Sequence, residues 1–134
     1  MAIATNRVDD MSKNNIICWT DIPVTNLERA IQFYSAVLAK SVRKESGPDF
    51  ELGVLPHTGD EVGGCLVQGP EHQPSEKGPL VYLSVEGRLD QAVQAVEKNG
   101  GKVIREKHAI GPYGYRALIR DSEGNRMALH SQSA

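Results

Sequence analysis

Two stretches of the chain, residues 15–69 and 79–132, repeat one order of strand, amphipathic helix and three further strands. A shared order of elements is harder to obtain by chance than any one identity, although two amphipathic helices followed by strands could also align trivially. The repeat predicts an α+β fold of two tandem βαβββ modules within one domain, 15–134. A single shift pairs Ala30 with Ala92, Ile31 with Val93, Lys40 with Lys102, Val42 with Ile104 and Arg43 with Arg105.

The first module begins with a strand at 15–24, which is rich in β-branched and aromatic residues and ends near a proline. A helix over 26–39 follows, with apolar residues at helical spacing. Thr25 or Asn26 can cap this helix, and Glu28 stands where a capping box from Thr25 needs it. The remaining strands are expected at 40–45, 50–55 and 62–68, with turns at 46–49 and 57–60.

A linker at 70–78, rich in proline and polar residues, leads to the second module. A strand at 80–85 precedes a helix that closes at Asn99-Gly100-Gly101. The hairpin connection at 121–125 contains Gly124 and Asn125, either of which can take positive φ. Leu89, Ala92, Val93 and Val96 mark the helix, and further strands are expected at 102–107, 113–120 and 126–131.

The composition excludes several classes of function. With 40% apolar and 24% charged residues, the chain is typical of a soluble domain, and no apolar run approaches the roughly 20 residues of a membrane span. A net charge of −2 with scattered basic residues does not indicate nucleic-acid binding. Cys18 and Cys65 lack metal-binding or disulfide spacing and are interpreted as small core residues. Residues 1–14 do not resemble a signal peptide, so we expect a loosely ordered tail on a cytoplasmic protein, with Met11 as a possible native start.

The segment IPVTNLERAIQFY (22–34) resembles the opening of the vicinal oxygen chelate superfamily, which includes glyoxalase I, bleomycin-resistance proteins, fosfomycin-resistance enzymes and extradiol dioxygenases. Residues 81–107 and 114–131 resemble its second module, and the closest likeness is to the glyoxalase-related branch. The resemblance implies that each module curls a mixed four-stranded sheet into half a cup and that paired modules enclose a cavity. The resemblance indicates the fold specifically but says little about the reaction, because one fold hosts unrelated activities.

In metal-dependent members of the superfamily, His, Glu or Gln from the first and fourth strand of each module bind a divalent ion. Carried over to this chain, three of these positions fall on Trp19, Leu80 and Ala128, none of which can bind a metal. The fourth strand of the first module offers only Cys65 and Gln68 in its body. The resemblance therefore implies that the metal site is absent and that no cofactor is bound. A register slip of two residues would instead present Asp21, Tyr82 and His130 to a relocated divalent metal.

The alternation of side chains along strands predicts the lining of the cup. A pocket of aromatic walls and few polar groups is typical of small-ligand sites. Tyr113 or Tyr115 could stack on a ligand, and Arg116 could bind an anionic group. In the alternative without a ligand, Trp19 and Tyr82 fill the cup as core residues, Asp21 pairs with an arginine, and His130 is a solvated strand end. The other histidines, His57, His72 and His108, are interpreted as surface residues. The predicted ligand-binding residues are Trp19, Asp21, Tyr82, Ser84, Tyr113, Tyr115, Arg116 and His130.

Three functions are consistent with this pattern. The first is a small-molecule-binding protein without the family metal site, which sequesters or transforms a small amphipathic or aromatic compound. The second is a lyase or isomerase of the lactoylglutathione lyase-related type, with Asp21 as a catalytic base or with a relocated metal. The third is an interaction module whose cup is plugged. Exposed strand edges favour a homodimer, and the modules could pair within one chain or between two.

Overall fold

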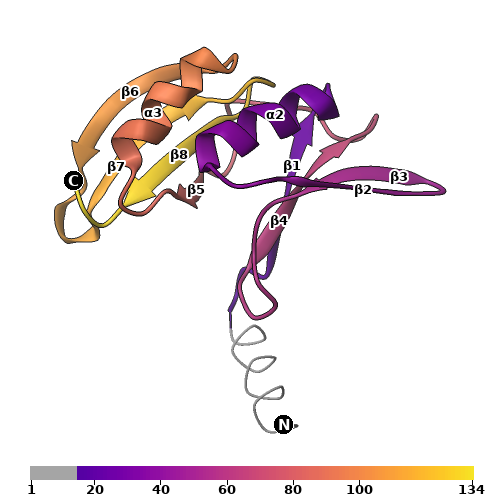
Figure 1. The fold of residues 1–134 in the computed structure, drawn as a ribbon, viewed down its shortest axis with the longest axis horizontal. Helices are drawn as coiled ribbons and strands as arrows, with labels where there is room; N and C mark the ends of the chain where they lie inside the picture. Colours follow the sequence, from indigo (N-terminus) through magenta and orange to yellow (C-terminus); the bar gives the residue numbers. More distant parts are fainter. Residues whose placement is uncertain (1–14) are drawn as a thin grey trace, which may run out of the picture.

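The computed structural model describes residues 15–134, which form two open four-stranded sheets with one helix each (Figure 1). The expected tail, 1–14, lies outside the described residues. The first module contains β1 (Trp19–Val24), α2 (Leu27–Leu38), β2 (Arg43–Gly47), β3 (Phe50–Val54) and β4 (Gly63–Gln68). The second contains β5 (Val81–Ser84), α3 (Leu89–Lys98), β6 (Lys102–Ala109), a 3-10 turn η1 (Gly111–Tyr113), β7 (Tyr115–Arg120) and β8 (Arg126–Ser131).

Both sheets have the same strand order, β1-β4-β3-β2 in the first module and β5-β8-β7-β6 in the second. In each, the first strand pairs in parallel with the last, and the other neighbours are antiparallel. The predicted α+β fold of two βαβββ modules is therefore confirmed. Only the ends of elements differ: β2 begins at Arg43, because Ala39 ends α2 with φ 56° and the backbone of Val42 donates to the Ser35 hydroxyl at 3.0 Å.

Asn26 caps α2, since its side chain accepts a hydrogen bond from the Arg29 amide at 3.0 Å. The capping box expected between Thr25 and Glu28 does not form. The Thr25 amide and hydroxyl both donate to Glu123 at 3.0 Å, and Glu28 forms an ion pair with Lys44 at 2.5 Å. A carboxylate from the second module thus takes the place that a local capping residue would fill.

One hydrophobic core joins the modules, because α2 and α3 pack against each other between the two sheets (Figure 1). Gly101, between α3 and β6, packs tightly against α2 and β7, and a Cβ atom there would lie 2.6 Å from both the Phe33 ring and the Arg120 carbonyl. Glycine is therefore required for this packing. The buried helix residues are Leu27, Ala30, Phe33, Tyr34 and Val37 of α2, and Leu89, Ala92 and Val96 of α3.

The turn at 121–125, between β7 and β8, fastens the second module to the start of α2. Asp121 accepts a hydrogen bond from the buried Tyr34 hydroxyl at 2.5 Å, and the Asn125 side chain donates to the Pro23 carbonyl at 2.7 Å. Glu123 accepts from the Asn26 amide at 2.8 Å. Gly124 takes the positive φ predicted for this turn. The connection that ends the second module is thus also a contact between modules.

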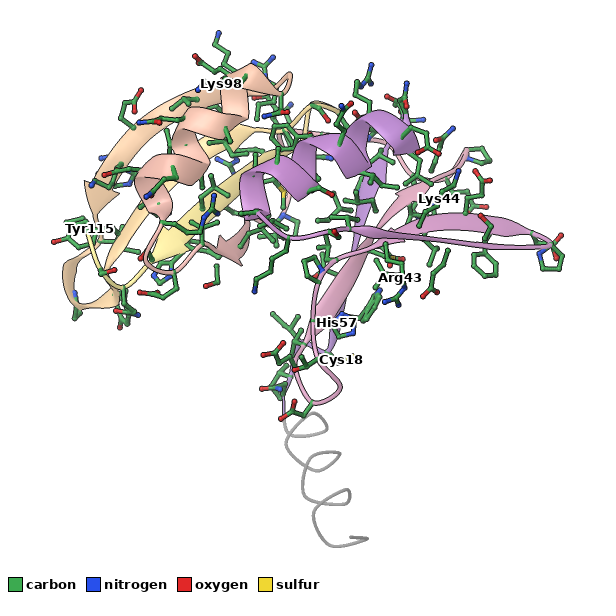
Figure 2. The ribbon with its side chains drawn as sticks, in the orientation of Figure 1. Cys18, Arg43, Lys44, His57, Lys98 and Tyr115 are labelled. Atoms are coloured by element: carbon green, nitrogen blue, oxygen red, sulfur yellow. The ribbon has the colours of Figure 1, made fainter. Side chains whose placement is uncertain are left out.

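Each sheet has one face toward the helices and an opposite face, which we call its open face. On β1, Ile22 and Val24 are buried toward the helices, whereas Trp19 and Asp21 are exposed on the open face. On β5, Tyr82 and Ser84 are exposed in the same way. Figure 2 shows His57 and Cys18 at the free end of β1 and β4, away from the helices. Within residues 15–134, no helix is long and apolar enough to span a membrane.

Candidate functional site

The open face of the second sheet carries a cluster centred on Arg116. This residue lies on β7, which pairs with β6 on one side and with β8 on the other. The Arg116 guanidinium donates to the Tyr82 hydroxyl on β5 and, through Nε, to Nε2 of His108 on β6 at 3.0 Å. Its central carbon lies 5.8 Å from the centroid of the Tyr82 ring. The ring of His130 on β8 lies edge-on to Tyr82 with centroids 6.2 Å apart. Four side chains from four strands therefore meet on one surface, which we call the arginine cluster.

Hydrogen bonding sets the tautomer of both imidazoles in the arginine cluster. His108 Nδ1 lies 2.9 Å from the Glu106 carbonyl, which can only accept, while Nε2 accepts from Arg116. His108 is therefore the Nδ1–H tautomer. His130 Nε2 lies 2.6 Å from the Tyr113 carbonyl and so carries a proton there. Arg116 is consequently held by fixed partners at Tyr82 and His108, which restricts the movement of a long side chain.

The open face of the first sheet carries a second cluster, formed by Trp19, Asp21, Cys65 and His57. The Trp19 indole donates to Asp21 Oδ1 at 3.1 Å, and the Cys65 thiol donates to the same oxygen at 3.2 Å. The ring of His57 stands edge-on to Trp19 with centroids 5.6 Å apart. Two donors thus fix one oxygen of the carboxylate, and Oδ2 accepts no hydrogen bond from residues 16–134.

Burial, together with the neighbouring Asp21 carboxylate, raises the pKa of the Cys65 thiol to about 11. The thiol is therefore protonated at neutral pH and acts as a donor to Asp21. A protonated, buried thiol is a poor nucleophile. Cys65 is thus a small core residue, as predicted, with the added task of orienting a carboxylate. Cys18, interpreted as a core residue from the sequence, is exposed, because it precedes β1 at the free end of the sheet.

Most of the residues predicted to bind a ligand lie on the open faces. Trp19 and Asp21 meet on the first sheet, and Tyr82, Arg116 and His130 meet on the second, with Ser84 exposed one step along β5. Tyr113 is exposed in η1 and touches His130 through its carbonyl. Tyr115 packs against the core, on the opposite face of β7 from Arg116.

His108 is a member of the arginine cluster that the sequence did not predict, since its loop or strand-edge position indicates only a surface residue. The structure places it opposite Arg116 in the antiparallel pairing of β6 and β7. A register shift between Arg105 and His108 interrupts the alternation from which facing residues are read. The position of His108 directly after the expected strand 102–107, which precedes the strand of Arg116, was the one available signal.

The residues at the positions that the resemblance assigns to a metal do not fit a metal ion. Trp19 and Ala128 have no metal-binding atom, and Leu80 lies just before β5. Within residues 15–134, no group of three or more His, Cys, Asp or Glu side chains is arranged to hold a metal. The relocated set of Asp21, Tyr82 and His130 fits no better, because the Arg116 cation donates to the Tyr82 oxygen and would repel a second cation there.

A cavity of about 250 Å³ beside β1 is lined by Asp21 together with residues of the linker and of β8. Among these are Ser75, Lys77 and Arg126. Asp21 thus lines this cavity and also belongs to the cluster on the open face.

Comparisons with known proteins point to one family. Residues 16–129 match the model of the Glyoxalase/Bleomycin resistance protein/Dioxygenase superfamily. A "Glyoxylase-like domain-containing protein" from Didymella fabae is 27% identical over 113 residues, which cover 81% of this chain and 88% of that protein.

Solved structures have the same fold. A glyoxalase/bleomycin resistance protein from Albidiferax ferrireducens T118 superposes with a TM-score of 0.67 at 17% identity, covering 87% of this chain and 98% of the other. A glyoxalase I mutant from Zea mays also superposes with a TM-score of 0.67 at 21% identity. The superposition covers 86% of this chain and 46% of the maize chain. At these identities the likeness concerns the fold alone.

Proposed function

Because the chain belongs to the Glyoxalase/Bleomycin resistance protein/Dioxygenase superfamily, we propose that it binds a small amphipathic or aromatic compound on its open faces without a metal ion. The observation that carries this proposal is the arginine cluster, in which a guanidinium is fixed beside an exposed aromatic ring. Tyr82 is 47% exposed, and its hydroxyl and ring are both in contact with Arg116. A flat ring can stack on such a surface while an anionic group pairs with the guanidinium.

Trp19 supports the same proposal from the first module. It is the only tryptophan of the chain and is 43% exposed on the open face. A large aromatic side chain left in contact with water is a common anchor for ligands. The polar groups beside it are oriented in advance, which lowers the entropic cost of binding.

Fluorescence titration with 8-anilinonaphthalene-1-sulfonate, an aromatic anion, tests this function. We expect saturable binding that quenches Trp19, and a roughly 10- to 100-fold weaker affinity for Arg116→Ala, since one charge-assisted hydrogen bond contributes about 1.5–3 kcal/mol. Arg105→Ala, on the neighbouring strand β6, is the matched control and should bind as the wild type does. Equal affinity of all three proteins would rule out the arginine cluster as the site. Native mass spectrometry of untagged protein would reveal a co-purified compound or a metal, and stoichiometric metal would contradict the metal-free proposal.

A second candidate is a metal-free lyase or isomerase that uses Asp21 as a general base. The geometry of the carboxylate favours it, because Oδ1 is occupied by Trp19 and Cys65 while Oδ2 is left to accept a proton. Turnover of hemithioacetals by wild-type protein, abolished in Asp21→Asn, would support catalysis. Binding without turnover by both proteins would support sequestration instead.

We also propose that the protein forms a homodimer through the segment that precedes β1. Ile16 is 98% exposed and Ile17 is 69% exposed, and adjacent apolar side chains in water favour association. Trp19, which begins the cluster with Asp21, Cys65 and His57, follows directly along the chain. A second copy bound to Ile16 and Ile17 would therefore cover part of the open face. Native mass spectrometry should show a dimer for the wild type and a monomer for Ile17→Lys, and a wild-type monomer would contradict the proposal.

A further inference from the structure

A cleft of about 570 Å³ separates the two modules at the C-terminal end of α2. It lies at the opposite end of this helix from the 121–125 turn, which fastens the N-terminal end. Its volume is within the range of roughly 300–1,000 Å³ that is typical of small-molecule sites. We call it the inter-module cleft.

The inter-module cleft is distinct from the open faces. Ile22, Leu55 and Leu83, which line it, belong to the hydrophobic core on the helix side of the sheets or pack against it. Neither Trp19 nor Arg116 lines it, whereas Tyr82 and Ser84 contribute where β5 forms one edge and His57 contributes from the loop between β3 and β4. Its walls come from both modules and are mainly apolar: Ile22, Leu38, Leu55 and Val62 from the first, and Val81, Leu83 and Val85 from the second.

The two acids of the inter-module cleft already have partners. Glu61 accepts a hydrogen bond from the Thr58 amide at 2.9 Å, and Glu86 accepts from the amides of Gln132 at 2.8 Å and Ser133 at 3.3 Å. These backbone hydrogen bonds lower the pKa of both carboxyls. The acids are therefore ionised and each is held by backbone donors, and the charge of Glu61 also attracts Lys40.

Two cationic side chains of the cleft, Lys40 and Arg88, have donors that the protein does not use. Lys40 directly follows the end of α2, and its ammonium has no hydrogen bond or ion pair with residues 16–134. Arg88 uses Nη1 to donate to the Val37 carbonyl at 2.8 Å, which offsets the negative end of α2, and its other guanidinium donors have no such partner. Arg88 also occupies the N-cap position of α3, which has no side-chain cap. The cleft thus offers two cationic donors.

We propose that the inter-module cleft binds an amphipathic carboxylate of the medium-chain fatty acid type. The hydrocarbon chain lies between the apolar walls of the two modules, and the carboxylate pairs with Lys40 and Arg88. Such a ligand contacts both modules at the end that the 121–125 turn leaves unfastened. Binding therefore stabilises the folded chain, and the stabilisation grows with the logarithm of the ligand concentration above its Kd.

Isothermal titration and thermal unfolding of the full chain with decanoate test this inference. We expect one decanoate per chain and a rise in Tm, with decylamine producing neither. Lys40→Glu should weaken decanoate binding at least tenfold, whereas Lys98→Glu, on the remote end of α3 (Figure 2), should leave it unchanged. Val62→Trp, at an exposed position of the cleft wall, should block binding by filling the space.

Three results would overturn the inference. These are equal binding of decanoate by wild type and Lys40→Glu, equal binding of decylamine and decanoate by wild type, and undiminished binding of decanoate by Val62→Trp. The titration of the open face uses Arg116 and Trp19, which do not line the cleft. Failure of either proposal therefore leaves the other measurable on its own.

Discussion

Arg29 on α2 and Glu123 in the 121–125 turn form an ion pair between the two modules, with Nε 2.7 Å from Oε2 and Nη2 3.0 Å from Oε1. The Glu123 side chain is fully buried, while that of Arg29 is half exposed. Burial alone would raise the pKa of this carboxyl. Hydrogen bonds from Arg29, Asn26, Ser122 and Thr25 outweigh it and lower the pKa to about 2. One carboxylate thus caps a helix and joins the modules.

Glu123→Gln should reduce the free energy of unfolding by about 2–3 kcal/mol, because a buried charge-assisted network and a helix cap are both weakened. Urea unfolding at neutral pH measures this loss. Glu45→Gln, which breaks an exposed ion pair with Arg43 within one strand, is the matched control and should cost under about 1 kcal/mol. Equal losses in the two variants would mean that the modules are held together by the shared core alone.

The contribution of Glu123 should also depend on pH. Its folded pKa, about 2, lies below the unfolded value of 4.5, so the stabilisation is complete above about pH 4.5 and is lost as the pH falls toward 2. The stability difference between wild type and Glu123→Gln should therefore shrink across this window. Urea midpoints measured from pH 6 to pH 2 follow it, and a difference that stays constant would contradict the assigned pKa.

Tyr34 should remain neutral in the folded protein at alkaline pH. Burial, followed by the charge and hydrogen bond of Asp121, raises its pKa well above 10.0. Because the folded pKa is raised, the associated stabilisation is present below pH 10 and is lost as the pH rises toward the folded value. Absorbance at 295 nm should increase equally in folded wild type and Tyr34→Phe up to pH 10.5. A larger increase in the wild type would show that Tyr34 ionises in the native state.

The two cysteines should differ strongly in reactivity. Cys18 is exposed, whereas Cys65 is buried with a thiol pKa raised to about 11 by burial. At pH 8, a disulfide reagent should therefore modify one thiol of the native protein quickly and the second only on unfolding. Cys18→Ser should remove the fast phase, and Cys65→Ser should leave it intact. Fast reaction in Cys18→Ser would contradict the burial of Cys65.

The sequence predicted the fold because its two signals are local and repeated. Helical spacing and turn residues recur in both modules, and each element needs only its own residues to be recognised. The exact start of β2 was not predictable, because it depends on a hydrogen bond from the Val42 amide to the side chain of Ser35. Asn26 was correctly predicted as a cap of α2, but the capping box of Thr25 and Glu28 was wrong for a similar reason, since the carboxylate that replaces it comes from Glu123.

The candidate site was predicted in part. Strand alternation placed Trp19 with Asp21 and Tyr82 with His130, because these pairs follow from the pleat of regular strands. His108 and Tyr115 could not be assigned in this way. The first lies beyond a register shift in β6, and the second starts β7 directly after η1, where the preceding backbone turns. The inter-module cleft has no sequence signal, since its walls are core residues of two modules.

His108 should act on ligand binding through Arg116 rather than by contact. It accepts the Arg116 Nε hydrogen bond at 3.0 Å, so His108→Ala frees one side of the guanidinium without removing its charge. We expect about 3- to 10-fold weaker binding of the anilinonaphthalene sulfonate, because a single net hydrogen bond contributes about 1 kcal/mol. The double variant with Arg116→Ala should bind no more weakly than Arg116→Ala alone, since a positioning residue has nothing left to position. His72→Ala, in the loop after β4, is the control and should leave binding unchanged. Additive losses in the double variant would instead mean that His108 contacts the ligand directly.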